Sequence, residues 1–125
     1  MDDDPSGGLQ SQGALLGAAL RGIRKARGLR TSQVADAIGL PLRTYQRLEE
    51  GSGPFELDRI KLFADFTDSD PFAIVASIWL QSPEFAVRAI DTKPLVVFTL
   101  ALREFHEDLE DDIRLIEPRV WWGGF

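Results

Sequence analysis

Two short runs of apolar residues lie at helical spacing in the first half of the chain, separated by three residues. The first run is Val34, Ala35 and Ile38, and the second is Leu42, Tyr45 and Leu48. Between them, Gly39 can take the left-handed conformation that ends a helix, and Pro41 presets the backbone that enters the next one. The pattern predicts a helix-turn-helix, with Leu40 as the buried plug of its turn.

The second helix of this motif carries polar side chains on its outer face. They are Arg43, Thr44, Gln46 and Arg47. Such side chains reach base edges and phosphates, since arginine pairs with guanine and glutamine with adenine. We therefore expect a helix that reads DNA, with Arg43 as its best single base reader and Tyr45 in the core with its hydroxyl at the edge.

Further helices are predicted on both sides of the motif, over residues 13–27, 57–66 and 72–80. Their apolar positions are Leu16, Leu20 and Ile23 in the first, Ile60, Phe63 and Ala64 in the second, and Phe72, Val75, Ile78 and Trp79 in the third. Gly28 ends the first helix, and Asp70 followed by Pro71 starts the third.

In this order the elements resemble the lambda-repressor-like, or Cro/CI/XRE, helix-turn-helix DNA-binding domain. The resemblance covers residues 14–78 and includes the run LGAALRGIRKARGL at residues 16–29. It implies an all-α protein, with a five-helix bundle in which residues 34–38 lie in the supporting helix and residues 42–49 in the recognition helix. It also implies a structural ion pair between Arg24 and Glu49.

The resemblance extends to the DNA contacts. It implies base reading by Leu42, Arg43, Thr44, Gln46 and Arg47, and phosphate contacts by Arg21, Lys25, Arg27, Thr31 and Ser52. Leu42 stands at the first outward position, where a leucine can touch a thymine methyl group. The chain departs from the family at three places. Arg30-Thr31-Ser32-Gln33 replaces the usual cap residue followed by Gln at the start of the supporting helix, where Thr31 or Ser32 can still cap. Pro41 replaces a capping Ser or Thr before the recognition helix, and the loop over residues 52–56 has no basic side chains.

A helical extension is predicted beyond the resemblance, with a short helix to about residue 90 and a longer one from Pro94 to about residue 116. The longer helix carries an apolar seam whose members alternate three and four apart: Leu95, Phe98, Leu102, Phe105 and Leu109. The chain closes with Trp121, Trp122 and Phe125. We expect these residues to bind a second subunit or a partner, or else to fold back on the chain's own helices. The predicted domains are a disordered acidic leader at residues 1–12, the DNA-binding domain at 13–80 and the extension at 81–125.

Composition limits the class of protein. The 125 residues include no cysteine, which excludes disulfides and thiolate zinc sites. No apolar run is long enough to cross a bilayer and no secretory signal is visible, so we expect a cytoplasmic location. No nucleophile and base constellation, phosphate loop or metal spacing can be assembled, so we expect neither an enzyme nor a cofactor. His106 and the acidic residues around it are interpreted as a solvated helix face.

The net charge of −6 is unusual for a protein that neutralises phosphates, but the charges are unevenly distributed. Residues 14–51 hold seven basic side chains against three acidic ones, whereas residues 52–125 hold seven against fourteen. The positive field therefore lies on the helix-turn-helix. We predict a sequence-specific regulator of transcription that binds double-stranded DNA as a homodimer on a two-fold operator. A repressor is favoured over an activator. The alternative is a protein-interaction adaptor or antitoxin-like partner built on the same fold, acting through its C-terminal helices.

Overall fold

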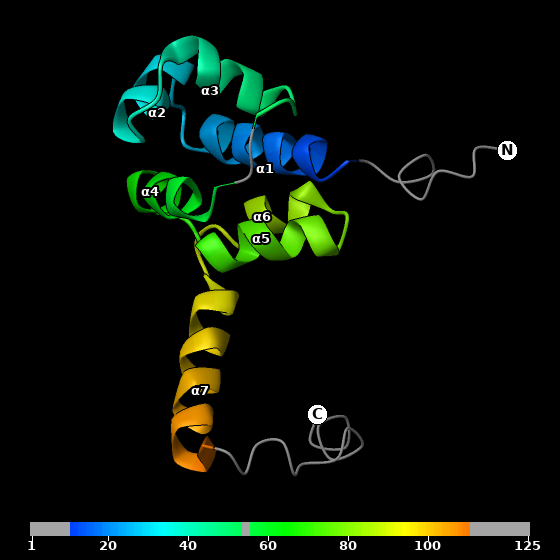
Figure 1. Ribbon diagram of the computed structural model, residues 1–125, viewed down its shortest axis with the longest axis vertical. Helices are drawn as coiled ribbons and strands as arrows, with labels where there is room; N and C mark the ends of the chain where they lie inside the picture. Colours follow the sequence, from blue (N-terminus) through cyan, green and yellow to red (C-terminus); the bar gives the residue numbers. More distant parts are fainter. Residues whose placement is uncertain (1–10, 54–55, 111–125) are drawn as a thin grey trace, which may run out of the picture.

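The computed structural model describes residues 11–53 and 56–110, and every regular element within them is an α-helix. In chain order the helices are α1 (Gln12–Ala26), α2 (Thr31–Ala37), α3 (Leu42–Glu49), α4 (Leu57–Thr67), α5 (Pro71–Trp79), α6 (Pro83–Arg88) and α7 (Pro94–Leu109). The first six pack into a bundle, and α7 extends away from it (Figure 1). The all-helical prediction is confirmed.

Helix α1 runs through the centre of the bundle and contacts α3, α5 and α6. Ser11 is its N-cap, and the Ser11 hydroxyl oxygen accepts a hydrogen bond from the backbone N–H of Ala14 at 3.1 Å. The helix therefore begins at Gln12, within the predicted leader at residues 1–12, whose residues 1–10 lie outside the described part of the chain. Leu16, Leu20 and Ile23 are buried as expected, and the helix ends before Gly28, which has a φ of +68°.

Helices α2 and α3 form the predicted helix-turn-helix, and Gly39 in the turn has a φ of +72°. Val34, Ala35, Ile38, Tyr45 and Leu48 all lie in the core. Two details differ from the prediction. Leu40 packs against the core but is only half-buried, and the Tyr45 hydroxyl is enclosed instead of lying at the edge.

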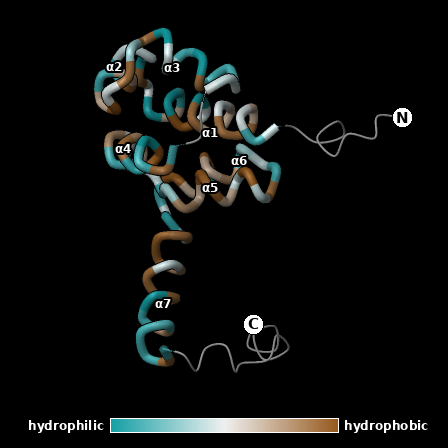
Figure 2. Tube along the Cα trace, in the orientation of Figure 1, coloured by the Kyte–Doolittle hydropathy of each residue, from teal (hydrophilic) through white to brown (hydrophobic). Residues whose placement is uncertain are grey.

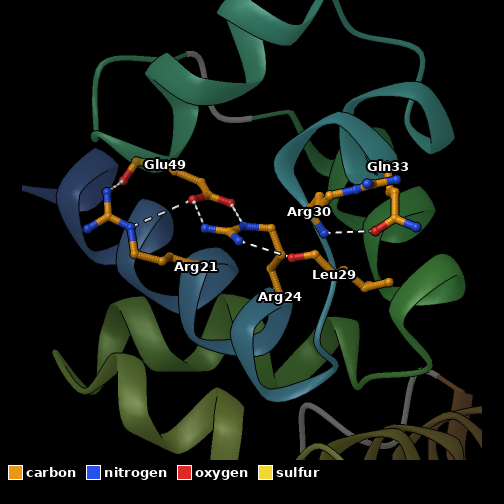
Figure 3. Close-up of polar contacts among 6 residues, drawn as sticks. All are labelled: Arg21, Arg24, Leu29, Arg30, Gln33 and Glu49. Carbon is orange, nitrogen blue, oxygen red and sulfur yellow. Dashed lines mark hydrogen bonds and ion pairs between the residues drawn. The ribbon is translucent and has the colours of Figure 1, made fainter.

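The start of α2 also differs from the prediction, because neither Thr31 nor Ser32 caps it. Both hydroxyl residues lie inside the first turn of the helix, one and two positions after the N-cap residue Arg30, and so too late to cap it. The side chain of Gln33 reaches back instead, and its Oε1 accepts a hydrogen bond from the backbone N–H of Arg30 at 2.8 Å. Gln33 therefore has a structural partner within its own helix (Figure 3).

Helices α4 and α5 close the side of the bundle away from α3. In α4, the predicted inward residues Ile60, Phe63 and Ala64 are buried. In α5, Asp70 caps the helix as predicted, with its Oδ1 accepting from the backbone N–H groups of Phe72 and Ala73. The buried residues of α5 are Ala73, Ile74, Ser77 and Ile78, whereas Phe72 is 40% exposed and Trp79 is 84% exposed.

Helix α6 is part of the bundle, where it packs against α1 and α5. Ala86 and Ile90 contribute to the same hydrophobic core as α1. The packed region thus continues to residue 90, beyond the boundary at residue 80 that the sequence predicts.

Helix α7 has no buried residue. Its first half is hydrophobic and its second half hydrophilic (Figure 2). The predicted continuation to residue 116, and Trp121, Trp122 and Phe125, lie outside the described residues. Among the helices that are described, none has the length and apolar character needed to cross a membrane.

Candidate nucleic-acid interface

The outer face of α3 presents the side chains expected to read bases. Arg43 and Arg47 are exposed, Thr44 and Gln46 are half-buried, and Leu42 is 43% exposed, which agrees with an outward position. Arg43, Gln46 and Arg47 line one depression of the surface together with Glu50. Neither arginine has an acidic partner within the described residues. Two permanent positive charges and an amide are thus held side by side at the surface.

A buried ion pair anchors the opposite side of α3 to α1. Arg24 Nε donates to Glu49 Oε2 at 2.7 Å and Arg24 Nη2 donates to Glu49 Oε1 at 3.0 Å, a bidentate arrangement (Figure 3). The Glu49 side chain is 4% exposed, and its hydrogen bond raises the pKa of Arg24. Arg24 Nη1 also donates to the Leu29 carbonyl oxygen at 3.1 Å. The pair implied by the resemblance is therefore present, and it fixes the end of α3 instead of reading DNA.

Two glycines let α3 approach α1 more closely than side chains would allow. A Cβ atom on Gly17 would lie 2.4 Å from the Glu49 carbonyl oxygen, and one on Gly13 would lie 2.4 Å from the Gly51 carbonyl oxygen. Gly13 and Gly17 are four residues apart and so lie on one face of α1. Their role is not among the predictions made from the sequence, although two glycines at this spacing inside a helix are a signal of close backbone packing.

Tyr45 lies on the inner face of α3, and its side chain is 0% exposed. Its hydroxyl is buried without a hydrogen-bond partner. Burial, with the nearby Glu49 carboxylate adding to it, raises the pKa of Tyr45 above its ordinary value of 10.0. The tyrosine is therefore a neutral core residue beside the ion pair and takes no part in DNA reading.

The basic residues of α1 divide into two groups. Lys25 is exposed. Arg21 is 47% exposed, with its Nε 3.6 Å from Glu49 Oε1 and its Nη2 donating to the Glu49 carbonyl oxygen at 3.5 Å. Arg27 is occupied: its Nε donates to the Thr67 carbonyl oxygen at 2.8 Å, and its Nη2 lies 3.1 Å from the Asp91 carboxylate. These partners hold its guanidinium against the bundle, so the predicted contact of Arg27 with phosphate would require them to be released.

The two hydroxyl residues expected at phosphates lie at opposite ends of the motif. Thr31 is the first residue of α2 and is half-buried. Ser52 is exposed just after α3, where its hydroxyl donates to the Arg47 carbonyl oxygen at 3.1 Å and helps to close the end of that helix. In the described ranges, no cluster of His, Cys, Asp and Glu side chains could hold a metal ion.

Comparison with known proteins identifies the same part of the chain. Residues 15–71 match the family model described as a helix-turn-helix domain. This range begins within α1, includes α2 to α4 and ends where α5 begins, so α6 and α7 lie outside it. No curated protein and no solved structure matches the chain.

Proposed function

We propose that the protein is a sequence-specific DNA-binding regulator of transcription that reads bases with α3, and the match of residues 15–71 to a helix-turn-helix family model supports the proposal. The observation that carries the proposal is the outer face of α3. Arg43 and Arg47 are exposed there without acidic partners in the described structure. The other face of the helix is tied to α1 by the ion pair between Glu49 and Arg24. A rigid helix with unpaired arginines is the arrangement that reads base edges in the major groove.

The residues of α3 would divide the recognition between them. Arg43 is the best candidate for a bidentate contact with guanine, and Arg47 and Gln46 lie beside it in the same depression. Thr44 would add a hydroxyl contact, and the exposed Leu42 would pack against a thymine methyl group. Lys25 and Arg21 on α1, with Thr31 and Ser52 at the ends of the motif, would contact phosphates and set the register of α3 on the duplex.

We further propose that the protein acts in the cytoplasm, as a homodimer on a two-fold operator, and we favour a repressor over an activator. One helix with two or three base readers discriminates poorly between sequences. Joining two half-sites raises the effective affinity without new contacts. The second half of α7 is acidic and cannot bind phosphate, so we expect the affinity to come from the helix-turn-helix and from pairing.

Two substitutions separate base reading from phosphate binding. We expect Arg43→Ala to cost about 1 to 3 kcal/mol on the cognate operator and less on scrambled DNA, because it removes a base contact. Lys25→Ala is the matched control, and it should weaken binding to both DNAs by a similar amount. Titrations of both duplexes at one salt concentration measure the difference. Equal losses on the two DNAs for Arg43→Ala would contradict its role as a base reader.

The second candidate function is a protein-interaction adaptor or antitoxin-like partner, for example one that contacts RNA polymerase. The exposed apolar side chains of α7, such as Val97 at 64% exposure, favour a protein contact. Salt distinguishes the two functions. Binding of DNA through the basic face should weaken steeply as salt rises, whereas an adaptor should bind its protein target in the absence of DNA.

A further inference from the structure

Helix α7 exposes a large apolar surface next to a bundle that is already complete. Phe98 is 51% exposed and Leu102 is 41% exposed, and these residues lie four apart on one face of the helix. The core, in contrast, contains seventeen buried residues from the bundle and none from α7. A soluble protein rarely leaves a contiguous apolar helix uncovered, so this surface requires an occupant.

The chain itself holds α7 away from the bundle. Asp70 is 1% exposed, and its two carboxylate oxygens serve different helices. Oδ1 caps α5, while Oδ2 accepts from the backbone N–H of Leu95 at 2.9 Å and of Val96 at 3.2 Å at the start of α7. Lys93, just before α7, pairs with Asp68 and lowers the pKa of that carboxyl. Both ties act at the base of α7 and direct the rest of the helix outwards (Figure 1).

We propose that the occupant is a second copy of this chain, paired along the seam of α7 with the two α7 helices parallel. The seam alternates three and four residues apart, which is the spacing at which identical helices pack side chains into each other. A two-fold pair satisfies both copies with the same surface. The parallel direction of the pairing rests on the proposed function. The interface itself rests only on the exposed surface of α7.

The seam supplies most of the apolar surface that such a contact needs. Phe98 and Phe105 are 51% and 36% exposed, which amounts to roughly 170 Å² if each side chain offers about 200 Å². With the leucines of the seam, each copy offers roughly 300 Å² of apolar surface, against about 800 Å² per partner in a standard interface, a little over half of it apolar.

The position of α3 selects the parallel arrangement. Helices α3 and α7 lie at opposite ends of the molecule (Figure 1). Two α7 helices that pair in parallel, about an axis along their length, place both bundles at one end with both α3 helices facing the same side. An antiparallel pair would turn the two α3 helices in opposite directions, so that they could not read one duplex.

Parallel pairing also brings the two acidic ends of α7 together. Glu104, Glu107, Asp108 and Glu110 are all exposed in the second half of the helix. Their mutual repulsion opposes association and is screened by salt. Self-association should therefore tighten as salt rises, whereas DNA binding should weaken, so the two properties respond to salt with opposite signs.

The test is the mass of the full-length protein in solution, measured by sedimentation equilibrium at tens of micromolar. We expect about twice the chain mass of 13.9 kDa, and a smaller dissociation constant when NaCl is raised about tenfold. Phe98→Glu should return the mass to that of one chain. Leu100→Glu is the matched control: Leu100 is similarly exposed, but it lies about 200° around the helix from Phe98, off the seam. Both variants should keep the helical circular dichroism of the wild type, since neither residue is buried.

Single cysteines give the direction of pairing, because the natural chain contains none. Leu109→Cys, at the far end of the seam, should form an intermolecular disulfide only in a parallel pair. Leu102→Cys lies at the centre of the seam and should cross-link in either direction.

A monomeric wild type would overturn the inference and assign the surface to residues 111–125 or to another protein. It would also be overturned by dissociation with Leu100→Glu, by a dimer that survives Phe98→Glu, or by a Leu109→Cys protein that does not cross-link while Leu102→Cys does. A dimer that behaves as expected but binds no DNA sequence selectively would contradict the proposed function and leave this interface standing.

Discussion

The bundle and α7 use apolar residues in opposite ways. In the bundle, Val34, Ile38 and Phe63 are at most 1% exposed, and the buried Glu49 carboxylate is paired with Arg24. In α7, residues of the same kinds remain in water, among them Val97 and Phe98. The bundle therefore holds α3 in place without any buried residue of α7. Helix α7 is therefore available to bring a second molecule alongside.

The largest expected effect is the loss of the ion pair that anchors α3. We expect Glu49→Ala to destabilise the protein by about 3 to 5 kcal/mol, because it leaves the Arg24 guanidinium partly buried without its carboxylate. Glu50→Ala is the matched control at the next position, where the side chain is exposed, and its effect should be small. Urea unfolding of the three proteins measures the difference. Similar midpoints for the two variants would mean that α3 is not anchored by this pair.

A pair of identical substitutions compares the two regions directly. Val34 is 0% exposed in α2 and Val97 is 64% exposed in α7. We expect Val34→Ala to cost about 1.5 to 3 kcal/mol from lost burial and the cavity that it leaves, and Val97→Ala to cost less than about 0.5 kcal/mol. The free energies of unfolding should be measured at low protein concentration, so that self-association does not contribute. Equal costs would show that α7 is covered within its own chain.

The smallest expected effect is a gain in stability. Tyr45→Phe removes a buried hydroxyl without a hydrogen-bond partner, and we expect the variant to be as stable as the wild type or more stable by about 1 kcal/mol at neutral pH. The difference should grow at alkaline pH. The unfolded tyrosine ionises near pH 10.0, whereas burial raises the pKa of Tyr45 in the folded state. Above pH 10 the unfolded wild type therefore loses a proton that the folded wild type keeps, and the wild type becomes less stable as pH rises. The Tyr45→Phe variant has no such loss.

A loss of stability in Tyr45→Phe at neutral pH would show instead that the hydroxyl has a favourable contact. Unfolding curves at several pH values, recorded for the variant and the wild type together, distinguish the two outcomes.

The sequence predicts the helices of the bundle well where their apolar residues are periodic, as in α1, where Leu16, Leu20 and Ile23 are all buried. It predicts the buried face of α5 poorly, because the run over residues 71–79 is apolar on every side and only its neighbours decide which side is covered. In the structure, Phe72 and Trp79 are exposed, while the small residues Ala73 and Ser77 are buried.

The candidate interface shows the same limit. The outward residues of α3 follow from helical spacing, which is a local property of the sequence. The fate of Arg27 does not, because its partners lie about forty residues further along the chain, at Thr67 and Asp68. A basic residue near a recognition helix is as well placed for a carbonyl of its own chain as for a phosphate, and only the packing of α1 against the end of α4 decides between them.

Selection of duplexes from a random pool by the full-length protein tests most directly whether α3 reads DNA. The account predicts an enriched sequence with two half-sites related by two-fold symmetry, their centres about one turn of DNA apart, roughly 34 to 36 Å. The Arg43→Ala, Arg47→Ala double variant, run in parallel, should lose that enrichment while it keeps its helical circular dichroism. A pool in which no sequence is enriched, or in which the double variant enriches the same sequence as the wild type, would contradict the claim that α3 reads DNA.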